Sequence, residues 1–507
     1  MRKQVRTLIL ISITVLLLVG GLLSLLFLLP EDEEETSSET SSEPTIDVVS
    51  KSTDDKGNTI DQPVKKIEVK NQKGSYEIIE KDNQLVVAGY EDLPVGTYEF
   101  ESLTRLLSSL TATRKITATN ISDFGLDKPR ATALVTYHDD SVISFELGND
   151  IAGDLSCYIR LNKEGPIYTV GSSFAEQLLK KPEAYIGTTL ITAPATKTDQ
   201  TDSTGTVDTP ILKNMKLSGT VRKDKPFAFG INDSKDKDTV FANFVYITTS
   251  PYRKGTADSV SRMAQTVTTL TAVEAVKAHP TADQLKQYGL DNPHSVCDLT
   301  LAVQSPVTTD GETDYTYYNS TKYSIKLGGK DENGNYYAMV DDYNAVFAVS
   351  SESVPWAEMQ FGDAVNSLLF LRDITTVKSI QVTAKGKTNT FELTHLPDEE
   401  DNDKSMVVKV GGKTLSTPDF RSLYQVFMSI YRYGEAEKTP SGDADIVFAL
   451  TPVKSNDVKV IAKFYKKDAS LYTCVMSDGD VFTVKASSID QLYAQIENYL
   501  AGREVRI

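Results

Sequence analysis

Short segments in which apolar and polar residues alternate recur along most of this chain. In residues 131–137 (ATALVTY), Ala133, Val135 and Tyr137 occupy every second position. In residues 295–301 (SVCDLTL), Cys297, Leu299 and Leu301 do the same, with Cys297 at the place of Ala133. A period of two with one apolar face predicts strands that cover a core.

Other segments carry apolar residues at helical spacing. In residues 97–112 (TYEFESLTRLLSSLTA), Phe100, Leu103, Leu107 and Leu110 recur every three or four positions, which predicts an amphipathic helix. The same order of strands, a helix, further strands and a closing helix can be followed three times along the chain. Runs of short strands broken by one or two helices are typical of an α+β fold.

We therefore predict three related units of mainly antiparallel sheet, each with one or two helices. The predicted division is a cytoplasmic tail (1–6), a transmembrane helix (7–29), a disordered acidic linker (30–62), repeat unit 1 (63–191), a polar linker (192–208), repeat unit 2 (209–365) and a diverged repeat unit 3 (366–507).

Units 1 and 2 share a short motif, FGLDKP at residues 124–129 and YGLDNP at residues 288–293. A glycine just past a helix, followed by an apolar residue that packs back on the last turn, is a common helix ending, and the proline starts the next strand. A ligand-binding loop is the alternative. Unit 3 has TPSGDAD at this place. The structural residues of the motif are Gly125, Leu126, Pro129, Gly289, Leu290 and Pro293.

The N-terminal segment predicts a membrane anchor. Residues 8–29 contain no charged side chain, and about 20 such residues cross a bilayer as a helix. The basic residues Arg2, Lys3 and Arg6 precede this segment, so the N-terminus should be cytoplasmic and the bulk of the chain extracytoplasmic. A cleavable signal peptide or a buried helix is the alternative. The polar, acidic residues 30–62 predict an extended tether.

The charge of the chain argues against a nucleic-acid partner. The net charge is −17, and the sequence has no basic cluster beyond residues 1–6 to displace counterions from phosphates.

Metal, cofactor and disulfide chemistry have little support in the sequence. The cysteines are far apart, odd in number and without metal-binding spacing, so each is expected in a packed strand rather than in a zinc site. No two histidines have ligand spacing. We predict no metal site, no cofactor and no catalytic residue. The residues considered are Cys157, Cys297, Cys474, His138, His279, His294 and His395.

Known catalytic motifs are not found either. Ser234 and Lys237 fit a serine–lysine spacing, but they lie in the hydrophilic run NDSKDKDT, where the lysine would stay solvated and charged. A hydrolase of unrecognised type remains an alternative, because active sites are assembled in space.

One insertion suggests a binding surface. Unit 2 carries QSPVTTDGETDYTYYNSTK (residues 304–322), which unit 1 lacks, and it concentrates tyrosines on a predicted hairpin. Aromatic rings with a polar tip suit partner or glycan surfaces, whereas the simpler reading is an ordinary strand pair. The candidate binding residues are Tyr315, Tyr317 and Tyr318.

The apolar N-terminal segment and the repeated order of strands, helix, YGLD-x-P, an alternating strand, an x-x-L-G strand and Y-x-x-V resemble the family catalogued as domain of unknown function forty-three forty. The resemblance covers most of residues 63–365. It implies an extracytoplasmic accessory subunit of an ABC transporter related to the gliding-motility type, and it carries over no site residue.

Together these features predict a non-enzymatic, single-pass membrane protein that binds or scaffolds transporter subunits outside the cytoplasm. A binding module for a cell-envelope polymer or carbohydrate is the alternative function.

Overall fold

The computed structural model describes residues 45–49, 51–53, 59–118, 120–197, 207–223, 225–232, 244–253, 255–309, 312–341, 343–370, 372–397, 399–436, 438–454, 459–477 and 479–507. The predicted transmembrane segment 7–29 and most of the acidic linker 30–62 lie outside these residues. Within the described part of the chain, no helix combines the length and apolar character needed to cross a membrane.

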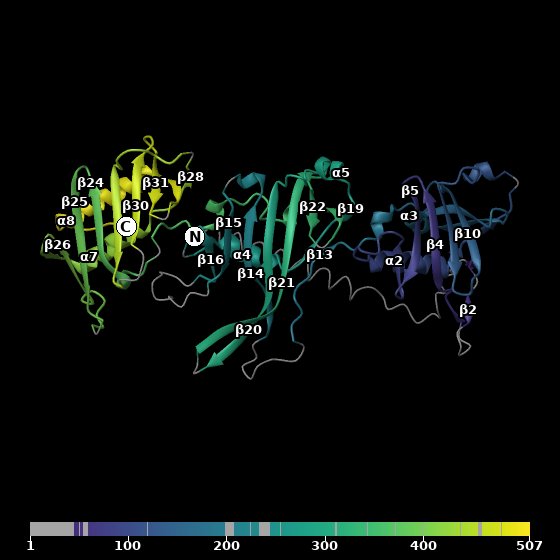
Figure 1. Ribbon diagram of the computed structural model, residues 1–507, viewed down its shortest axis with the longest axis horizontal. Coiled ribbons are helices and arrows are strands. Elements are labelled where there is room, and N and C mark those ends of the chain that lie inside the picture. Colours follow the sequence, from purple (N-terminus) through teal and green to yellow (C-terminus); the bar gives the residue numbers. More distant parts are fainter. Residues whose placement is uncertain are drawn as a thin grey trace, which may run out of the picture. The chain divides into compact units, whose positions relative to one another are not determined.

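Three large sheets form the described chain, and their strands follow one common order (Figure 1). In each sheet, the opening meander lies beside β9, β20 or β29, and three further strands follow in chain order. A short strand that lies between the main helix and this strand in the sequence, β8, β19 or β28, closes the edge. The strand pairs are antiparallel. The prediction of three mainly antiparallel sheet units is therefore confirmed. The orders are β6-β5-β4-β9-β10-β11-β12-β8, β17-β16-β15-β14-β20-β21-β22-β23-β19 and β27-β26-β25-β24-β29-β30-β31-β32-β28.

The first sheet and its neighbours come from the following elements: β4 (Val64–Asn71), β5 (Gly74–Lys81), β6 (Gln84–Val87), α2 (Thr97–Ser108), β8 (Arg114–Ile116), η1 (Ile121–Phe124), β9 (Ala131–Tyr137), β10 (Val142–Asp150), β11 (Ser156–Leu161), β12 (Ile167–Gly171), α3 (Ser172–Leu178) and η2 (Pro182–Tyr185). Three small strand pairs lie outside the large sheets: β1 (Ile46–Asp47) with β7 (Thr111–Ala112), β2 (Ser52–Thr53) with β3 (Thr59–Ile60), and β13 (Thr189–Ile191) with β18 (Leu270–Thr271).

The second sheet contains β14 (Thr209–Ser218), β15 (Phe227–Ile231), β16 (Tyr246–Ser250), β17 (Tyr252–Arg253), β19 (Glu274–Ala278), β20 (Ser295–Thr309), β21 (Glu312–Lys330), β22 (Tyr336–Val340) and β23 (Ala345–Val349). Its helices and turns are η3 (Thr220–Arg222), α4 (Asp258–Thr266), α5 (Ala282–Gln287), η5 (Ser351–Ser353) and α6 (Phe361–Ala364).

The third sheet contains β24 (Val377–Ala384), β25 (Lys387–His395), β26 (Met406–Val410), β27 (Lys413–Leu415), β28 (Gly434–Glu435), β29 (Ile446–Pro452), β30 (Val460–Lys466), β31 (Leu471–Met476) and β32 (Val481–Lys485). Its helices are η6 (Ile374–Thr376), α7 (Thr417–Met428) and α8 (Ala486–Leu500).

The described residues divide into two compact units. The first comprises the residues up to Val64 together with Arg105–Leu178, and it includes β8 to β12 and α3. The second comprises Lys65–Thr104 and Leu179–Ile507, and it includes β5, β6 and the second and third sheets.

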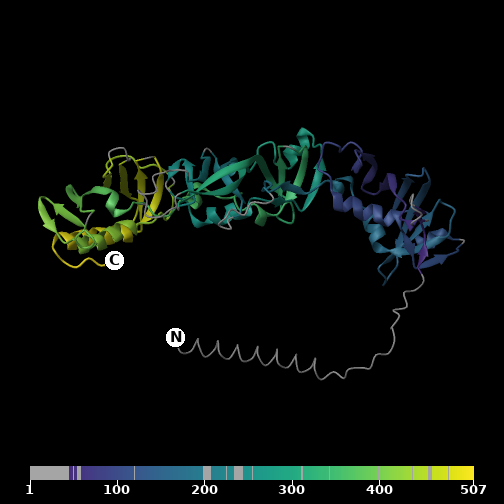
Figure 2. The same ribbon diagram turned by 90° about the horizontal axis from the view of Figure 1, so that it is seen from below.

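The cores of the second and third sheets each lie between one face of the sheet and its helices. In the third sheet, α7 buries Phe420, Leu423 and Phe427, which recur at helical spacing, and α8 buries Ile489, Leu492 and Ile496 in the same way. Figure 2 shows these two helices on one side of the strands. The second core is built likewise from α4 and from alternating residues of β14 and β20.

The second sheet has a feature that the described residues of the other two sheets do not show. β20 and β21 contain 15 and 19 residues, whereas their counterparts β9 and β10 contain 7 and 9. The extra length forms a two-stranded ribbon that continues past the other strands of the sheet (Figure 1). We call its described residues, 304–309 and 312–319, the arm.

Candidate functional site

The FGLDKP motif forms a tight helix ending in the first compact unit. Gly125 ends η1 with a φ of 71°, in the left-handed region that favours glycine. The backbone N–H of Leu126 donates to the carbonyl of Ile121 at 3.1 Å, and the Leu126 side chain is buried. The helix before the glycine is a single 3-10 turn rather than a longer α-helix.

The YGLDNP motif gives the same ending in the second unit. Helix α5 begins with a capping box formed by Thr281 and Gln284, and Gly289 follows the helix with a φ of 70°. The N–H of Leu290 donates to the carbonyl of Leu285 at 2.8 Å. Both copies of the motif therefore reverse the chain and bury one leucine.

Each motif packs against a second glycine, which follows a leucine near the end of β10 or β21. A Cβ atom on Gly148 would lie 2.2 Å from the carbonyl oxygen of Phe124. A Cβ atom on Gly328 would lie 2.1 Å from the carbonyl oxygen of Tyr288, and that oxygen accepts the N–H of Gly329 at 2.8 Å. The paired glycines let two backbones touch, so the shared motif serves folding. Pro129 and Pro293 precede the strands β9 and β20 that follow.

The three candidate tyrosines of the arm differ in their surroundings. Tyr315 is 48% exposed. Tyr317 and Tyr318 are partly buried, and each has a lysine of the same chain over its ring: Lys213 Nζ lies 5.3 Å from the ring centre of Tyr317, and Lys197 Nζ lies 4.6 Å from that of Tyr318.

Tyr318 also binds two residues of the polar linker 192–208. Its hydroxyl accepts the backbone N–H of Lys197 at 3.0 Å and donates to Asp208 Oδ2. The bond from Tyr318 lowers the pKa of Asp208 below its ordinary value. Nearby, Asn319 Nδ2 donates to the carbonyl of Ala195 at 2.8 Å. Sequence reasoning treated these tyrosines as one surface, whereas Tyr318 is occupied by its own chain.

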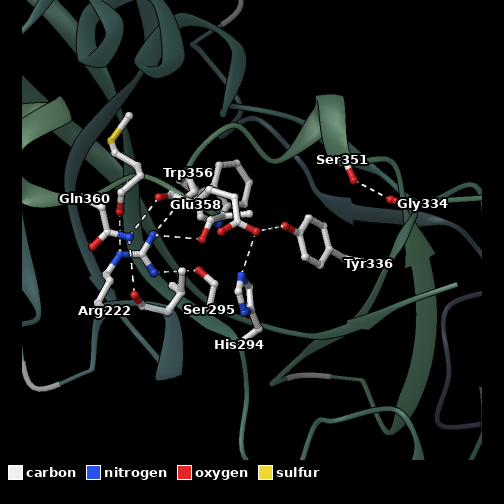
Figure 3. Close-up of polar contacts among 12 residues, drawn as sticks. Arg222, His294, Ser295, Gly334, Tyr336, Ser351, Trp356, Glu358 and Gln360 are labelled. Atoms are coloured by element: carbon white, nitrogen blue, oxygen red, sulfur yellow. Dashed lines mark hydrogen bonds and ion pairs between the residues drawn. The ribbon is translucent and has the colours of Figure 1, made fainter.

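Arg222, a buried arginine of the second compact unit, was not predicted from the sequence. Arg222 is 2% exposed, and its five N–H groups meet five acceptors (Figure 3). Nε donates to the Met359 carbonyl at 2.9 Å, Nη1 to the Ser218 carbonyl at 2.7 Å and to Ser295 Oγ at 2.9 Å, and Nη2 to the carbonyls of Trp356 and, at 3.3 Å, Ala357. Burial lowers the pKa of this guanidinium.

Arg222 thus holds the loop after η5 against the end of β14, and Glu358 projects from that loop. Glu358 Oε1 accepts the hydroxyl of Tyr336 at 2.5 Å and contacts His294 Nε2 at 2.8 Å (Figure 3). Lys330 Nζ lies 4.4 Å from the ring centre of Tyr336. We call Glu358, His294 and Tyr336 the Glu358 cluster.

The electrostatics of the cluster favour an ionised carboxylate. Burial alone would raise the pKa of Glu358, but the hydrogen bonds from Tyr336 and His294 outweigh it and lower the pKa overall. Burial, and then the hydrogen bond to Glu358, raise the pKa of the Tyr336 hydroxyl. A general base works best with a pKa near the working pH, and the Glu358 pKa is moved away from neutrality. The arrangement is suited to anchoring the loop.

A polar groove lies on the face of the second sheet opposite its core. Lys216, Asp298 and Ser324 stand side by side on β14, β20 and β21, and Ser324 Oγ donates to Asp298 Oδ1 at 2.6 Å. The groove has a volume of about 460 Å³. The lining residues are Asn214, Lys216, Asp298, Leu299, Thr300, Lys322, Tyr323, Ser324, Val340 and Asp341. This surface offers donors and acceptors to a polar ligand.

The remaining candidates are structural in position. The three cysteines are buried and none of them forms a disulfide, and burial raises the pKa of Cys157 to about 11. His279 Nε2 lies 2.9 Å from Asp92 Oδ1, and His395 Nε2 lies 2.7 Å from the Val377 carbonyl. In the described part of the chain, no three His, Cys, Asp or Glu side chains are grouped so that they could hold a metal ion.

A family model described as Domain of unknown function (DUF4340) matches residues 86–239 and 248–421, which together make up more than half of the chain. The chain belongs to this family. The resemblance noted from the paired glycine motifs is therefore confirmed. No curated protein and no solved structure matches the chain.

The two DUF4340 matches are shifted relative to the sheets. The first begins in β6 and extends past β15, and the second begins in β16 and ends in α7. Each match therefore joins the later part of one sheet to the opening strands of the next. The second match also reaches the start of unit 3, where the sequence motif is missing.

Proposed function

We propose that this chain is a membrane-anchored binding or scaffold protein that acts outside the cytoplasm as an accessory subunit of an ABC-type transport system. The uncharged residues 8–29, preceded by basic residues and followed by the acidic segment 30–62, support a single span with the N-terminus inside. The segment 30–62 would hold the sheet units away from the bilayer.

The arm is the observation that carries the binding role. It extends beyond the strands that flank β20 and β21, and it exposes Val307 and Tyr315 at 41% and 48%. A sheet normally protects or shortens such an extension, because open strand edges and exposed apolar side chains invite pairing with another chain.

The proposal is tested by purification from native membranes. The tagged full-length protein, extracted in mild detergent, should retain membrane subunits of an ABC-type transporter, identified by mass spectrometry. A variant without residues 2–30 is the control for the anchor and should be released from the membrane fraction. Recovery of the full-length protein without any transporter subunit contradicts the proposal.

The polar groove favours a second candidate, binding of a cell-envelope polymer or carbohydrate. Its side chains can exchange hydrogen bonds with sugar hydroxyls at several points. In this case, the full-length protein should sediment with isolated wall material, and Lys216→Ala together with Lys322→Ala should release it. Sedimentation that the double variant leaves unchanged argues against the groove as the site.

A further inference from the structure

The arm itself indicates the chemistry of its partner. Two of its three tyrosines already bind a cation of this chain, because Lys213 lies over Tyr317 and Lys197 lies over Tyr318. The third, Tyr315, is 48% exposed, and no lysine or arginine of the described residues lies over its ring. An aromatic face in this position attracts a lysine or arginine from outside.

The geometry of the arm places Tyr315 on an accessible face. Tyr315 pairs with Pro306 and Tyr317 pairs with Gln304, so the two tyrosines point to the same side of the ribbon. Tyr318 points to the other side. Asn319 follows with a φ of 48° at a register shift, and such a bulge bends the strand. One face of the arm is thereby held by the linker, and Tyr315 lies on the other.

The charge of the arm also selects for a basic partner. The sequence of the arm contains Glu312 and Asp314 but no lysine or arginine. A second copy of the same arm would meet like charges, whereas a basic segment would meet opposite ones.

The edges of the arm suit an extended partner. In the described chain, β14 pairs with β20 only as far as Gln304, and β22 pairs with β21 only from Ile325 onward. Pro306 removes one backbone donor from the β20 strand, which leaves the β21 edge as the better template for an added strand.

We propose that the arm docks an extended segment of a partner protein carrying a lysine or arginine, whose cation lies over the ring of Tyr315. This inference rests on the proposed binding function and specifies the chemistry of the partner.

Site-specific photocrosslinking in native membranes tests this contact. A photoreactive phenylalanine analogue replaces Tyr315 in the full-length protein, and the crosslinked peptide is sequenced by mass spectrometry. We expect one partner segment with a lysine or arginine next to the crosslinked position. The analogue at Tyr98, which is 73% exposed on α2, is the control and should give different products. A crosslink to a second copy of this chain, to a glycan, or to a segment without basic residues overturns the inference.

Ring substitutions supply a second readout. Tyr315→Phe keeps the aromatic face and should retain the partner, whereas Tyr315→Leu should weaken retention about tenfold. Tyr98→Leu should have no effect. Equal retention by Tyr315→Leu and the native protein overturns the inference but leaves the transporter role intact. A basic segment from a membrane protein that is not a transporter subunit supports the inference and overturns the transporter assignment.

Discussion

The turns that precede β9 and β20 share one backbone but differ in side-chain chemistry. Gly125 and Gly289 have φ angles of 71° and 70°, and Gly148 and Gly328 leave room for the carbonyl of the preceding turn. These four glycines meet the same steric requirement in two separate sheets. They explain why the sequence repeats itself at these positions.

The two turns differ in the residue that follows each proline, which is Arg130 in the first and His294 in the second. Arg130 bonds Asp150 through both terminal nitrogens, at 2.9 and 2.5 Å, and the Gly148 carbonyl through Nε at 2.6 Å. In the second sheet, His294 takes the place of Arg130, Lys330 takes the place of Asp150, and the carboxylate comes from the distant Glu358. The comparison shows that the backbone contact is fixed and that the adjacent ion pair can be replaced.

The largest loss of stability should come from adding a side chain where Gly328 contacts the Tyr288 carbonyl. Gly328→Ala forces a methyl group against the Tyr288 carbonyl and should destabilise the second sheet by about 4 kcal/mol. Urea unfolding followed by the fluorescence of Trp356, the single tryptophan, measures it. Gly334→Ala is the control. Gly334 has a φ of 84° but open space around it, so only about 1 kcal/mol of backbone strain is expected. If the two variants lose the same amount of stability, the close contact at Gly328 does not limit the substitution.

The second-largest loss of stability should come from removing the buried guanidinium of Arg222. Arg222→Met leaves carbonyls of the loop after η5 without donors and should cost about 3 kcal/mol. The same Trp356 fluorescence reports it, since that residue lies in the loop. Lys225→Met, at an exposed position nearby, should change the stability by less than about 0.5 kcal/mol. A small loss in Arg222→Met would mean that the loop holds its place without Arg222.

The Glu358 cluster should make the stability of the second sheet depend on pH in the acidic range. The folded pKa of Glu358 is lowered, so its contribution is present above the unfolded pKa of about 4.3 and is lost as the pH falls through the folded value. Because the side chain is 60% exposed, we expect less than about 1 kcal/mol. Glu358→Gln should be less stable than the native protein at pH 7, and this difference should vanish once the pH falls below the folded pKa of Glu358. Glu352→Gln, in the preceding turn η5, is the control. A difference that persists in acid argues against an ionic contribution.

The smallest loss of stability should come from a substitution in the turn before β9. Arg130→Met breaks an ion pair in which Asp150 is 61% exposed, and it should cost about 0.5 kcal/mol. Hydrogen exchange of β9 and β10 measures the loss within this sheet. Asp150→Asn should lower the stability by a similar amount. A loss of stability as large as that of Arg222→Met would contradict the conclusion that this ion pair can be replaced.

Local patterns predicted the strands and the helix endings well, because their causes are local. The alternation in residues 131–137 and 295–301 reflects one buried face, and a glycine at positive φ needs only its neighbours to explain it. The boundary of α2 was less predictable. Residues 97–112 suggested one helix, but α2 ends at Ser108, and Thr111–Ala112 pairs with β1 instead. That pairing depends on a segment about 65 residues earlier.

The Arg222 network could not be predicted from its surroundings. Arg222 lies in the charged run TVRKDK, which is typical of a solvated turn. Its acceptors Trp356, Ala357 and Met359 are 134 to 137 residues further along the chain. The orientation of the arm was equally hidden, since the bulge at Asn319 shifts the alternation and so decides which side of the sheet each ring takes.

The offset between the family matches and the sheets has a practical consequence for recombinant work. A fragment cloned to the borders of the second match would start in β16, and it would lose β14 and β15. The apolar row Leu212, Met215 and Leu217, which covers part of the core beside β20, would go with them. The truncated polypeptide should aggregate during expression. Residues 186–370 keep the strands of the second sheet together with β13, which pairs with β18, and are the better choice for crystallisation.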